Sequence, residues 1–211
     1  MRPLAFLSGL LLVTLALAPA PSTRAEEKKS ARTLGNIERL DPAFDNLIGR
    51  DAQLEILVGD HVWTEGPVWV RKGGYLLFSD IPRNSVYQWK PGKGQSLYLK
   101  PSGYTGTGRD LKEPGSNGLL LDPDGNLILM QHGDRRVALL TSHKDNKGKF
   151  KTLADRYKGA PLNSPNDGAY KSNGDLYFTD PPYGLKRKDW KEGDKDEFPG
   201  MEMDFCGVWR L

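Results

Sequence analysis

The stretch "NDGAYKSNGDLYFTDP" at residues 166–181 has two diverged copies earlier in the chain, "EGPVWVRKGGYLLFSD" at 65–80 and "NGLLLDPDGNLILMQH" at 117–132. The three segments align without gaps. Each has a glycine eight residues after its first residue, followed by an apolar, aromatic or β-branched strand. The starts are spaced by 52 residues (65 to 117) and 49 residues (117 to 166). A β-repeat near this period, at about four strands per unit, is typical of a propeller.

The segments between the repeats read as the outer hairpins of propeller blades. Two such hairpins flank the turns "KPGKG" and "SHKDNKG", with strands predicted at 85–89, 95–100, 135–141 and 149–155. A third begins at "CGVWRL" (206–211), delayed by an insertion at 184–205. The predicted fold class is therefore all-β, a β-propeller of which the chain holds about three incomplete blades of four-stranded antiparallel sheets.

Outside the repeat, the sequence predicts a leader, a lead-in and a first strand. Residues 1–25 combine Arg2, an apolar run at 4–18 and a cleavage site near "TRA", as in a secretory signal peptide, so we expect an exported protein, periplasmic or extracellular. An uncleaved membrane anchor is the alternative. The lead-in, 26–52, contains a short helix predicted at 41–49, with Asp41 as its cap. The propeller part is predicted at 53–211. Its first strand, predicted at 53–58, would normally pair with the final blade and is expected to be left without that partner.

Composition excludes some classes of partner and site. The 30 basic and 27 acidic residues become 28 and 27 once Arg2 and Arg24 are removed with the leader, and no basic cluster suggests nucleic-acid binding. We expect no membrane partner after signal cleavage. The charged run at 186–197 is interpreted as a solvated loop. A lone Cys206 excludes an intramolecular disulfide and a cysteine-based zinc site.

The first residues of the three repeats, Glu65, Asn117 and Asn166, are candidates for a binding site. The innermost strand of every blade lines the central channel of a propeller, so these side chains should converge at one end of it. Carboxylate and amide oxygens suit a hard cation, calcium above all. The alternative is that each caps a turn, as Asn and Asp commonly do before a strand. His132, fifteen residues after Asn117, is expected at the far end of its hairpin, as a packing residue.

Four motifs together resemble the SMP-30/gluconolactonase family, in its bacterial gluconolactonase branch: "TEGPVW" (64–69), "FSDIP" (78–82), "LNSPND" (162–167) and "YFTDPPYG" (177–184). The resemblance covers about residues 37–211. It implies a six-bladed propeller with one divalent cation, usually calcium, in the channel, and hydrolysis of sugar lactones. It places the family's metal-binding Glu on Glu65 and its channel Asn, which contacts metal or substrate, on Asn166.

The resemblance also leaves parts of the site open. Asn117 and Asp167 are further candidates for substrate binding. Ser164 stands where some relatives carry an Arg that holds the sugar, and Gly66 stands where paraoxonase-like relatives have an Asp for a second calcium. The family's remaining metal ligands, an Asn and an Asp that is also the usual candidate base, fall beyond residue 211, so the catalytic base is unknown and a fragment is expected. Two functions stay open: a metal-dependent lactone hydrolase, and a non-catalytic calcium- or ligand-binding propeller fragment.

Overall fold

The computed structural model describes residues 32–193 and 198–211. The predicted signal peptide, residues 1–25, lies outside the described residues. Within those ranges, no helix is both long and apolar enough to cross a membrane. The helices found there are two short 3-10 helices, η1 (Pro42–Asn46) and η2 (Tyr183–Leu185). The Asp41 side chain accepts a hydrogen bond from Ala43 N at 2.7 Å, which confirms the predicted cap at the start of η1.

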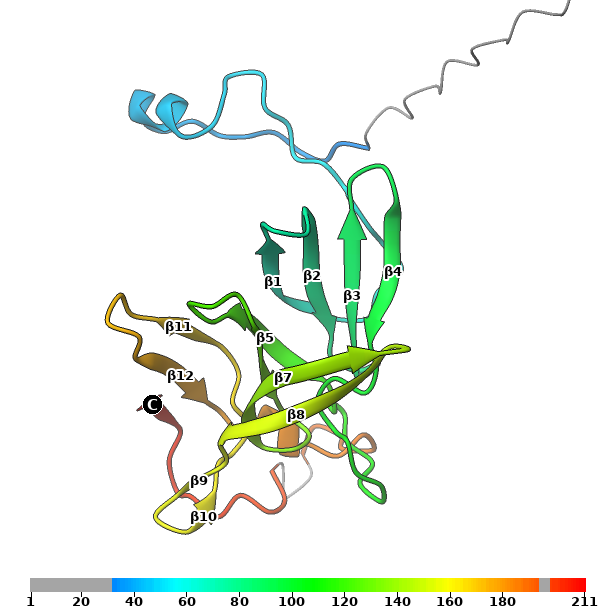
Figure 1. Ribbon diagram of the computed structural model, residues 1–211, viewed down its shortest axis with the longest axis vertical. Coiled ribbons are helices and arrows are strands. Elements are labelled where there is room, and N and C mark those ends of the chain that lie inside the picture. The colour runs from blue at the N-terminus through cyan, green and yellow to red at the C-terminus, as the bar shows by residue number, and fades with distance from the viewer. Residues whose placement is uncertain (1–31, 194–197) are drawn as a thin grey trace, which may run out of the picture. The chain divides into compact units, whose positions relative to one another are not determined.

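Three antiparallel sheets follow one another along the chain and form three propeller blades (Figure 1). Blade 1 contains β1 (Thr64–Val70), β2 (Tyr75–Asp80), β3 (Ser85–Lys90) and β4 (Gly94–Leu99). Blade 2 contains β5 (Ser116–Leu121), β6 (Leu127–Gln131), β7 (Arg136–Lys144) and β8 (Lys147–Ala154). Blade 3 contains β11 (Gly168–Tyr170), β12 (Leu176–Asp180) and β13 (Gly207–Arg210). A small hairpin of β9 (Arg156–Tyr157) and β10 (Ala160–Pro161) joins blades 2 and 3.

The inner hairpins confirm the repeat, but the gapless alignment is one residue out on the first strand of blade 1. Val70 pairs with Tyr75, whereas Leu121 pairs with Leu127 and Tyr170 with Leu176. The turn is thus one residue shorter in blade 1. By strand pairing, Glu65 corresponds to Ser116, the residue before Asn117, because Glu65 pairs with Ser79 and Ser116 with Gln131. Both inner strands are bulged here, between Glu65 and Val68 and between Ser116 and Leu119.

Two other predicted elements differ in the structure. The outer hairpin of blade 2 extends through most of "SHKDNKG", and its turn is only Asp145 and Asn146, both with positive φ. Positive φ at two central residues gives the turn a twist that matches the strands, so the pairing continues almost to the tip. The predicted strand at 53–58 is wrong: Glu55 makes only an isolated bridge to Thr33. With no neighbouring strand to supply a ladder, its backbone does not form a strand.

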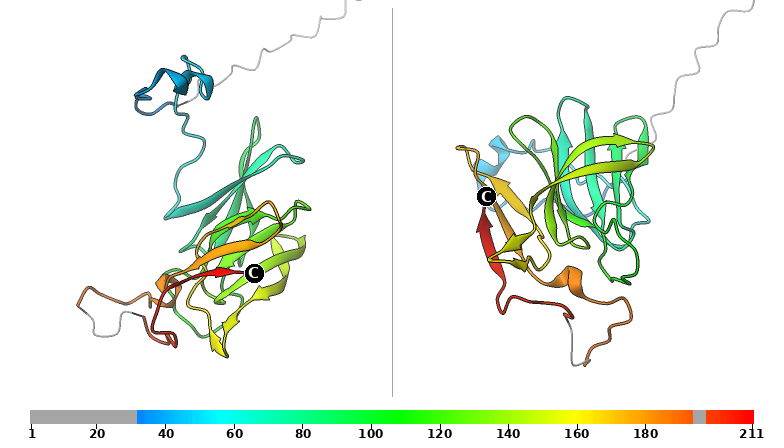
Figure 2. Two further views of the ribbon diagram at one scale, coloured as in Figure 1. Left: turned by 90° about the vertical axis from the view of Figure 1, so that its left-hand side faces the viewer. Right: turned by 60° about the horizontal axis from the view of Figure 1, so that its bottom comes forward.

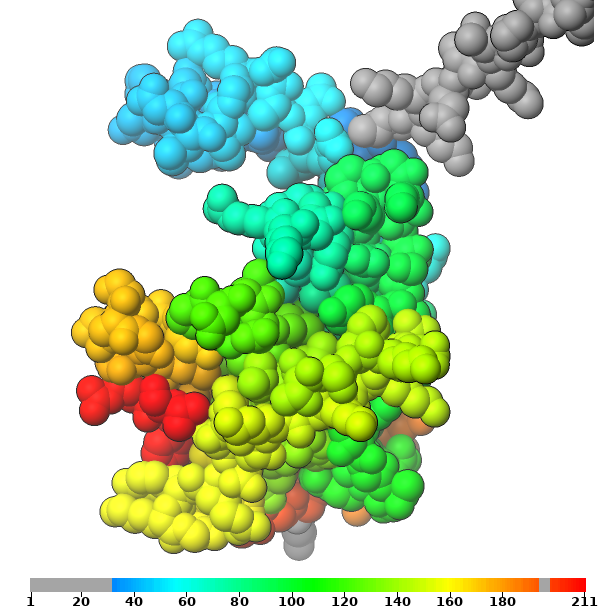
Figure 3. Space-filling model, viewed as in Figure 1, coloured from blue at the N-terminus to red at the C-terminus, as the bar shows by residue number. Residues whose placement is uncertain are grey.

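The blades pack face to face through apolar side chains that point out of each sheet. One cluster joins blade 1 to blade 2 and contains the buried residues Leu77, Val86, Leu99, Leu119, Leu127 and Leu129. The other joins blade 2 to blade 3 and contains Ile128, Met130, Val137, Leu162, Leu176, Phe178 and Met203. Alternate residues of β6 belong to the two clusters, as the period of two in a strand requires. Figures 2 and 3 show blade 2 between the other two blades.

Asp180, the last residue of β12, is fully buried behind this packing. Its Oδ2 accepts hydrogen bonds from Asn163 N at 2.9 Å and Trp209 Nε1 at 3.3 Å, while Oδ1 has no partner among the described residues. Burial raises the pKa of the Asp180 carboxyl above its ordinary value, although these hydrogen bonds act to lower it. The ionised form is therefore the costly one in the folded state.

This raised pKa predicts how stability changes with pH. The contribution of Asp180 is fully present below its unfolded pKa of about 4 and is lost as the pH rises through the higher folded value. We expect the free energy of unfolding of the full-length protein, measured with urea, to fall over this window relative to Asp180→Asn. Asp124→Asn, an exposed carboxylate in the β5–β6 turn, serves as the control and should follow the wild type. If the difference in the free energy of unfolding between wild type and Asp180→Asn does not change with pH, the prediction is contradicted.

Candidate functional site

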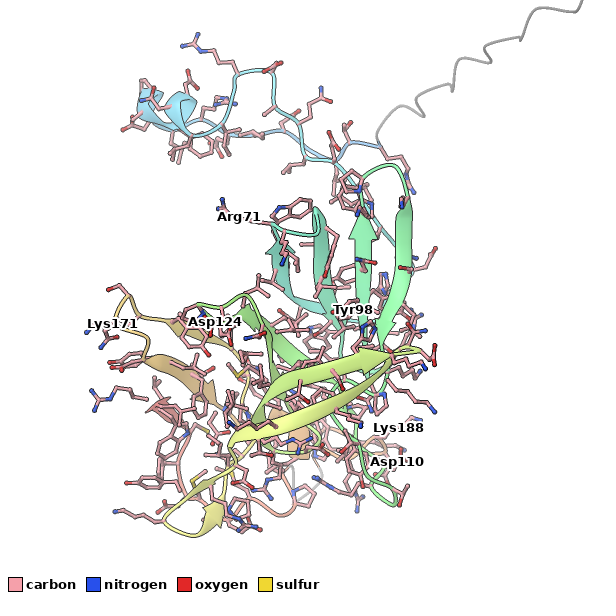
Figure 4. The ribbon with its side chains drawn as sticks, in the orientation of Figure 1. Arg71, Tyr98, Asp110, Asp124, Lys171 and Lys188 are labelled. Carbon is pink, nitrogen blue, oxygen red and sulfur yellow. The ribbon has the colours of Figure 1, made fainter. Side chains whose placement is uncertain are left out.

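The start of the first strand and the end of the second strand of each inner hairpin lie at the same end of the blade, because the two strands are antiparallel. Thr64 pairs with Asp80, and Ser116 pairs with Gln131. The turn residues Arg71, Asp124 and Lys171 lie at the opposite tips, on the other side from the loop residues Asp110 and Lys188 (Figure 4). The prediction that His132 lies at the far end of its hairpin from Asn117 is therefore wrong: it follows β6 directly and lies beside the start of β5.

A pocket of about 460 Å³ lies at this end of the blades. Glu65, Asn117 and Asn166 all line it, so the structure brings together the first residues of the three repeats. Its other lining residues come from the loops around them: Trp63, Ile81, Lys112, Glu113, Tyr183 and Lys186. A volume of this order is within the range of pockets that hold small organic molecules.

Glu65 is a half-buried carboxylate at the bulge of β1. Its Oε1 accepts a hydrogen bond from the indole Nε1 of Trp63 at 3.2 Å. Gly66, the next residue, has a φ of 57°, and a Cβ built on it would lie 2.4 Å from Asn117 O. Only a glycine lets the backbone of blade 1 come this close to blade 2, which brings Glu65 and Asn117 to the same pocket.

Hydrogen bonds between the blades hold the backbone of Asn117 and Asn166 in place. Ser79 Oγ donates to Asn117 O at 2.9 Å and lies 2.9 Å from Ser116 Oγ, all within the buried contact between blades 1 and 2. Gly118 N donates to Asn166 O at 2.7 Å, which joins blade 2 to blade 3. Asn117 is 9% exposed, and no partner of its side-chain amide is found among the described residues.

His132 lies directly behind Asn166 rather than in remote packing. The ring is fully buried, with Nε2 at 3.2 Å from Asn166 Nδ2 and Nδ1 at 3.3 Å from Glu113 Oε2. The Nδ1–Glu113 approach is close but not aligned as a hydrogen bond. Asn166 precedes β11, His132 follows β6 and Glu113 lies in the loop before β5, so sequence spacing alone gave no sign of the cluster.

Asp167, the fourth predicted site residue, is placed differently. It is exposed and is not among the residues that line the pocket. Its Oδ1 accepts a hydrogen bond from Gly168 N at 2.9 Å, and its backbone N–H approaches Thr179 Oγ1 at 3.2 Å. These local contacts are those of a turn residue at the start of a strand.

One wall of the pocket comes from two loops that sequence patterns did not connect. Lys112 N donates to Lys186 O at 2.9 Å, Lys188 N donates to Asp110 O at 3.0 Å, and Leu111 bridges to Arg187. Lys186 Nζ lies 4.0 Å from the centre of the Trp190 ring. Lys186 thus lines the pocket, while the next three residues of the charged run, 187–189, are exposed.

The oxygen atoms of this pocket fit a hard divalent cation. Two carboxylates, Glu65 and Glu113, and two amide side chains line it. Asn166 uses its Nδ2 for His132, which leaves Oδ1 without a hydrogen bond in the described part of the chain. Calcium accepts carboxylate and amide oxygens. No group of three or more His, Cys, Asp or Glu side chains suited to a metal occurs among residues 32–193 and 198–211.

The fold and the site together define a class of protein: propeller blades with an oxygen-lined pocket at the end where the inner strands begin. Residues 63–194 match the SMP-30/Gluconolactonase/LRE-like region. The chain is 36% identical over 213 residues to a gluconolactonase of Zymomonas mobilis, an alignment that covers 97% of this chain and 57% of that one.

Two solved structures are also similar. One is a gluconolactonase from Xanthomonas campestris, 27% identical, with a TM-score of 0.62 over 86% of this chain and 52% of that one. The other is a structural-genomics target of the gluconolactonase type, 32% identical, with a TM-score of 0.56 over 74% of this chain and 47% of that one. The chain belongs to the SMP-30/gluconolactonase family. It spans about half the length of the relatives it matches.

Proposed function

We propose that this chain contributes metal-binding residues to the site of a sugar-lactone hydrolase that uses one divalent cation, most simply calcium. The observation that supports the proposal is the convergence of Glu65, Asn117 and Asn166, from three separate blades, on one pocket. The similarity to gluconolactonases supports a lactone as the small-molecule substrate. Glu65 and Asn166 are the proposed metal ligands, and Asn117 and Asn166 the proposed contacts to the substrate.

The charged, aromatic and amide side chains of the pocket have different proposed roles in binding. The Glu65 carboxylate supplies the negative charge that holds a cation, and its hydrogen bond from Trp63 fixes one of its two oxygens. When bound, the cation would polarise the lactone carbonyl and stabilise the oxyanion that forms as water attacks it. Trp63 and Tyr183 offer apolar ring faces to the carbon skeleton of the sugar, and the amide groups offer hydrogen bonds to its hydroxyls.

The proposal predicts that removing the metal abolishes hydrolysis. After treatment of the full-length protein with EDTA and desalting, we expect its turnover of D-glucono-1,5-lactone to fall by about a hundredfold or more, because the oxyanion loses its main stabilising charge. Adding calcium should restore it, as followed by proton release in a weakly buffered indicator assay. Unchanged turnover in the metal-free protein would contradict the metal-dependent mechanism, whereas calcium binding with no turnover would favour the non-catalytic binding function.

A further inference from the structure

His132 is the buried side chain closest to the candidate ligands that the proposed chemistry does not use. It has no exposed surface, and it follows β6, which packs on both neighbouring blades. Gly184 lies against it, since a Cβ added there would come within 2.6 Å of His132 Cβ. The ring is therefore held in one position by its surroundings, and its two nitrogens contact two different pocket residues.

Contacts on the Nδ1 side favour one tautomer of the neutral ring. Glu113 Oε2 lies 3.3 Å from His132 Nδ1, and its side chain is only 12% exposed. The two atoms are not aligned for a hydrogen bond, but the negative charge of an ionised carboxylate favours a proton on the ring nitrogen that faces it. In the neutral ring Nε2 then carries no proton, so it can accept a hydrogen bond but cannot donate one.

The unprotonated Nε2 in turn determines the orientation of the Asn166 side-chain amide. The oxygen and nitrogen of an amide are assigned from the hydrogen-bond network around it, and an acceptor at 3.2 Å requires the NH2 group there. Oδ1 is then the end of the amide that is left for a ligand. With the amide turned over, the oxygen would face the lone pair of Nε2 and the NH2 group would face the cation, which repels it.

We infer that His132 is a positioning residue. Glu113 keeps its proton on Nδ1, and the unprotonated Nε2 then holds the Asn166 amide so that Oδ1 is available to the pocket. Ligand orientation by outer hydrogen-bond partners is a general way to tune a metal site. The inference rests on the proposed function only for its effect on calcium binding. The tautomer and the amide orientation stand on the protein's own contacts and can be tested without metal.

The direct test is NMR of the metal-free, full-length protein labelled with 15N-histidine. Two-bond nitrogen–proton correlations report which ring nitrogen carries the proton, and the signals of His132 are those absent from His132→Phe. At a pH where the ring is neutral, we expect the proton of His132 on Nδ1. A proton on Nε2 at that pH would overturn the inference, whether or not the protein binds calcium or hydrolyses lactones.

A double-mutant cycle on calcium affinity tests whether His132 acts through Asn166. By calorimetry, His132→Phe should weaken calcium binding by about tenfold to a hundredfold. Asn166→Ala should weaken it similarly, and the double variant should bind no worse than Asn166→Ala. If the fold-losses in calcium affinity of the two single variants multiply in the double variant, the inference is contradicted. His143→Phe is the matched control, since its ring stacks on Tyr98 at 4.4 Å, away from the pocket-lining residues, and should leave calcium affinity unchanged.

Discussion

Glu65→Gln is expected to remove nearly all lactone hydrolysis from the full-length protein and most of its calcium affinity. The substitution keeps the size of the side chain and a carbonyl oxygen but removes the negative charge of Glu65 from the pocket. A hard cation bound by few charged ligands depends strongly on each one, so we expect the dissociation constant for calcium to rise by about two orders of magnitude or more. Turnover at saturating calcium should still fall by about a hundredfold, because the cation would be held less firmly against the developing oxyanion.

Calorimetry with calcium and a proton-release assay measure these two effects, and circular dichroism checks that the fold is kept. Glu202→Gln is the matched control: it makes the same chemical change at a half-exposed residue paired with Arg135, outside the pocket, and should behave as wild type. Asn117→Ala should reduce activity less than Glu65→Gln, since it removes a neutral side chain. Wild-type calcium affinity in Glu65→Gln would show that the proposed ring of oxygens is not the metal site.

Gly66→Ala is expected to be strongly destabilising, by about 2–5 kcal/mol in the free energy of unfolding. Two causes add at this position. The φ of 57° is strained for any residue with a Cβ, and the added methyl group would lie 2.4 Å from Asn117 O and 2.7 Å from Leu119 N. Those atoms belong to the backbone of blade 2, so they cannot move aside as a flexible side chain would. We also expect lower activity in the fraction that folds, because Glu65 and Asn117 would be pushed apart.

Gly74→Ala separates the two causes. Gly74 also has positive φ, at 62°, and lies in the turn of the same hairpin, but a Cβ there would meet nothing within 4 Å. It should cost only about 1 kcal/mol, from backbone strain partly offset by the reduced freedom of the unfolded chain. Urea unfolding of both variants measures the difference. Equal losses in the two variants would mean that the close approach of blades 1 and 2 contributes little to stability.

The repeat allowed the fold to be predicted, because its alternating apolar residues and turn glycines occur in every copy. It also identified Glu65, Asn117 and Asn166 as residues that meet. The alignment was still one residue out at Glu65, since the turn of blade 1 is one residue shorter than that of blade 2 while both inner strands carry the same bulge.

Residues from outside the repeats could not be found in this way. Lys112, Glu113 and Lys186 lie on loops whose pairing depends on tertiary contacts, and loops carry no periodicity from which pairing can be predicted. His132 was misplaced for a different reason. Its distance along the chain from Asn117 was taken as distance in space, although an antiparallel hairpin returns the chain to its starting point.

The pocket has a thermal consequence that follows from its construction across blades. Each inner hairpin is closed by its own backbone ladder, whereas the pocket exists only while neighbouring blades stay docked, through contacts such as those of Ser79 with Asn117 and Gly118 with Asn166. On warming, a small rotation of one sheet against the next would disperse the binding oxygens before any strand melts. We therefore expect ligand binding to be lost at a lower temperature than the strands, and a bound cation would in turn hold neighbouring sheets together.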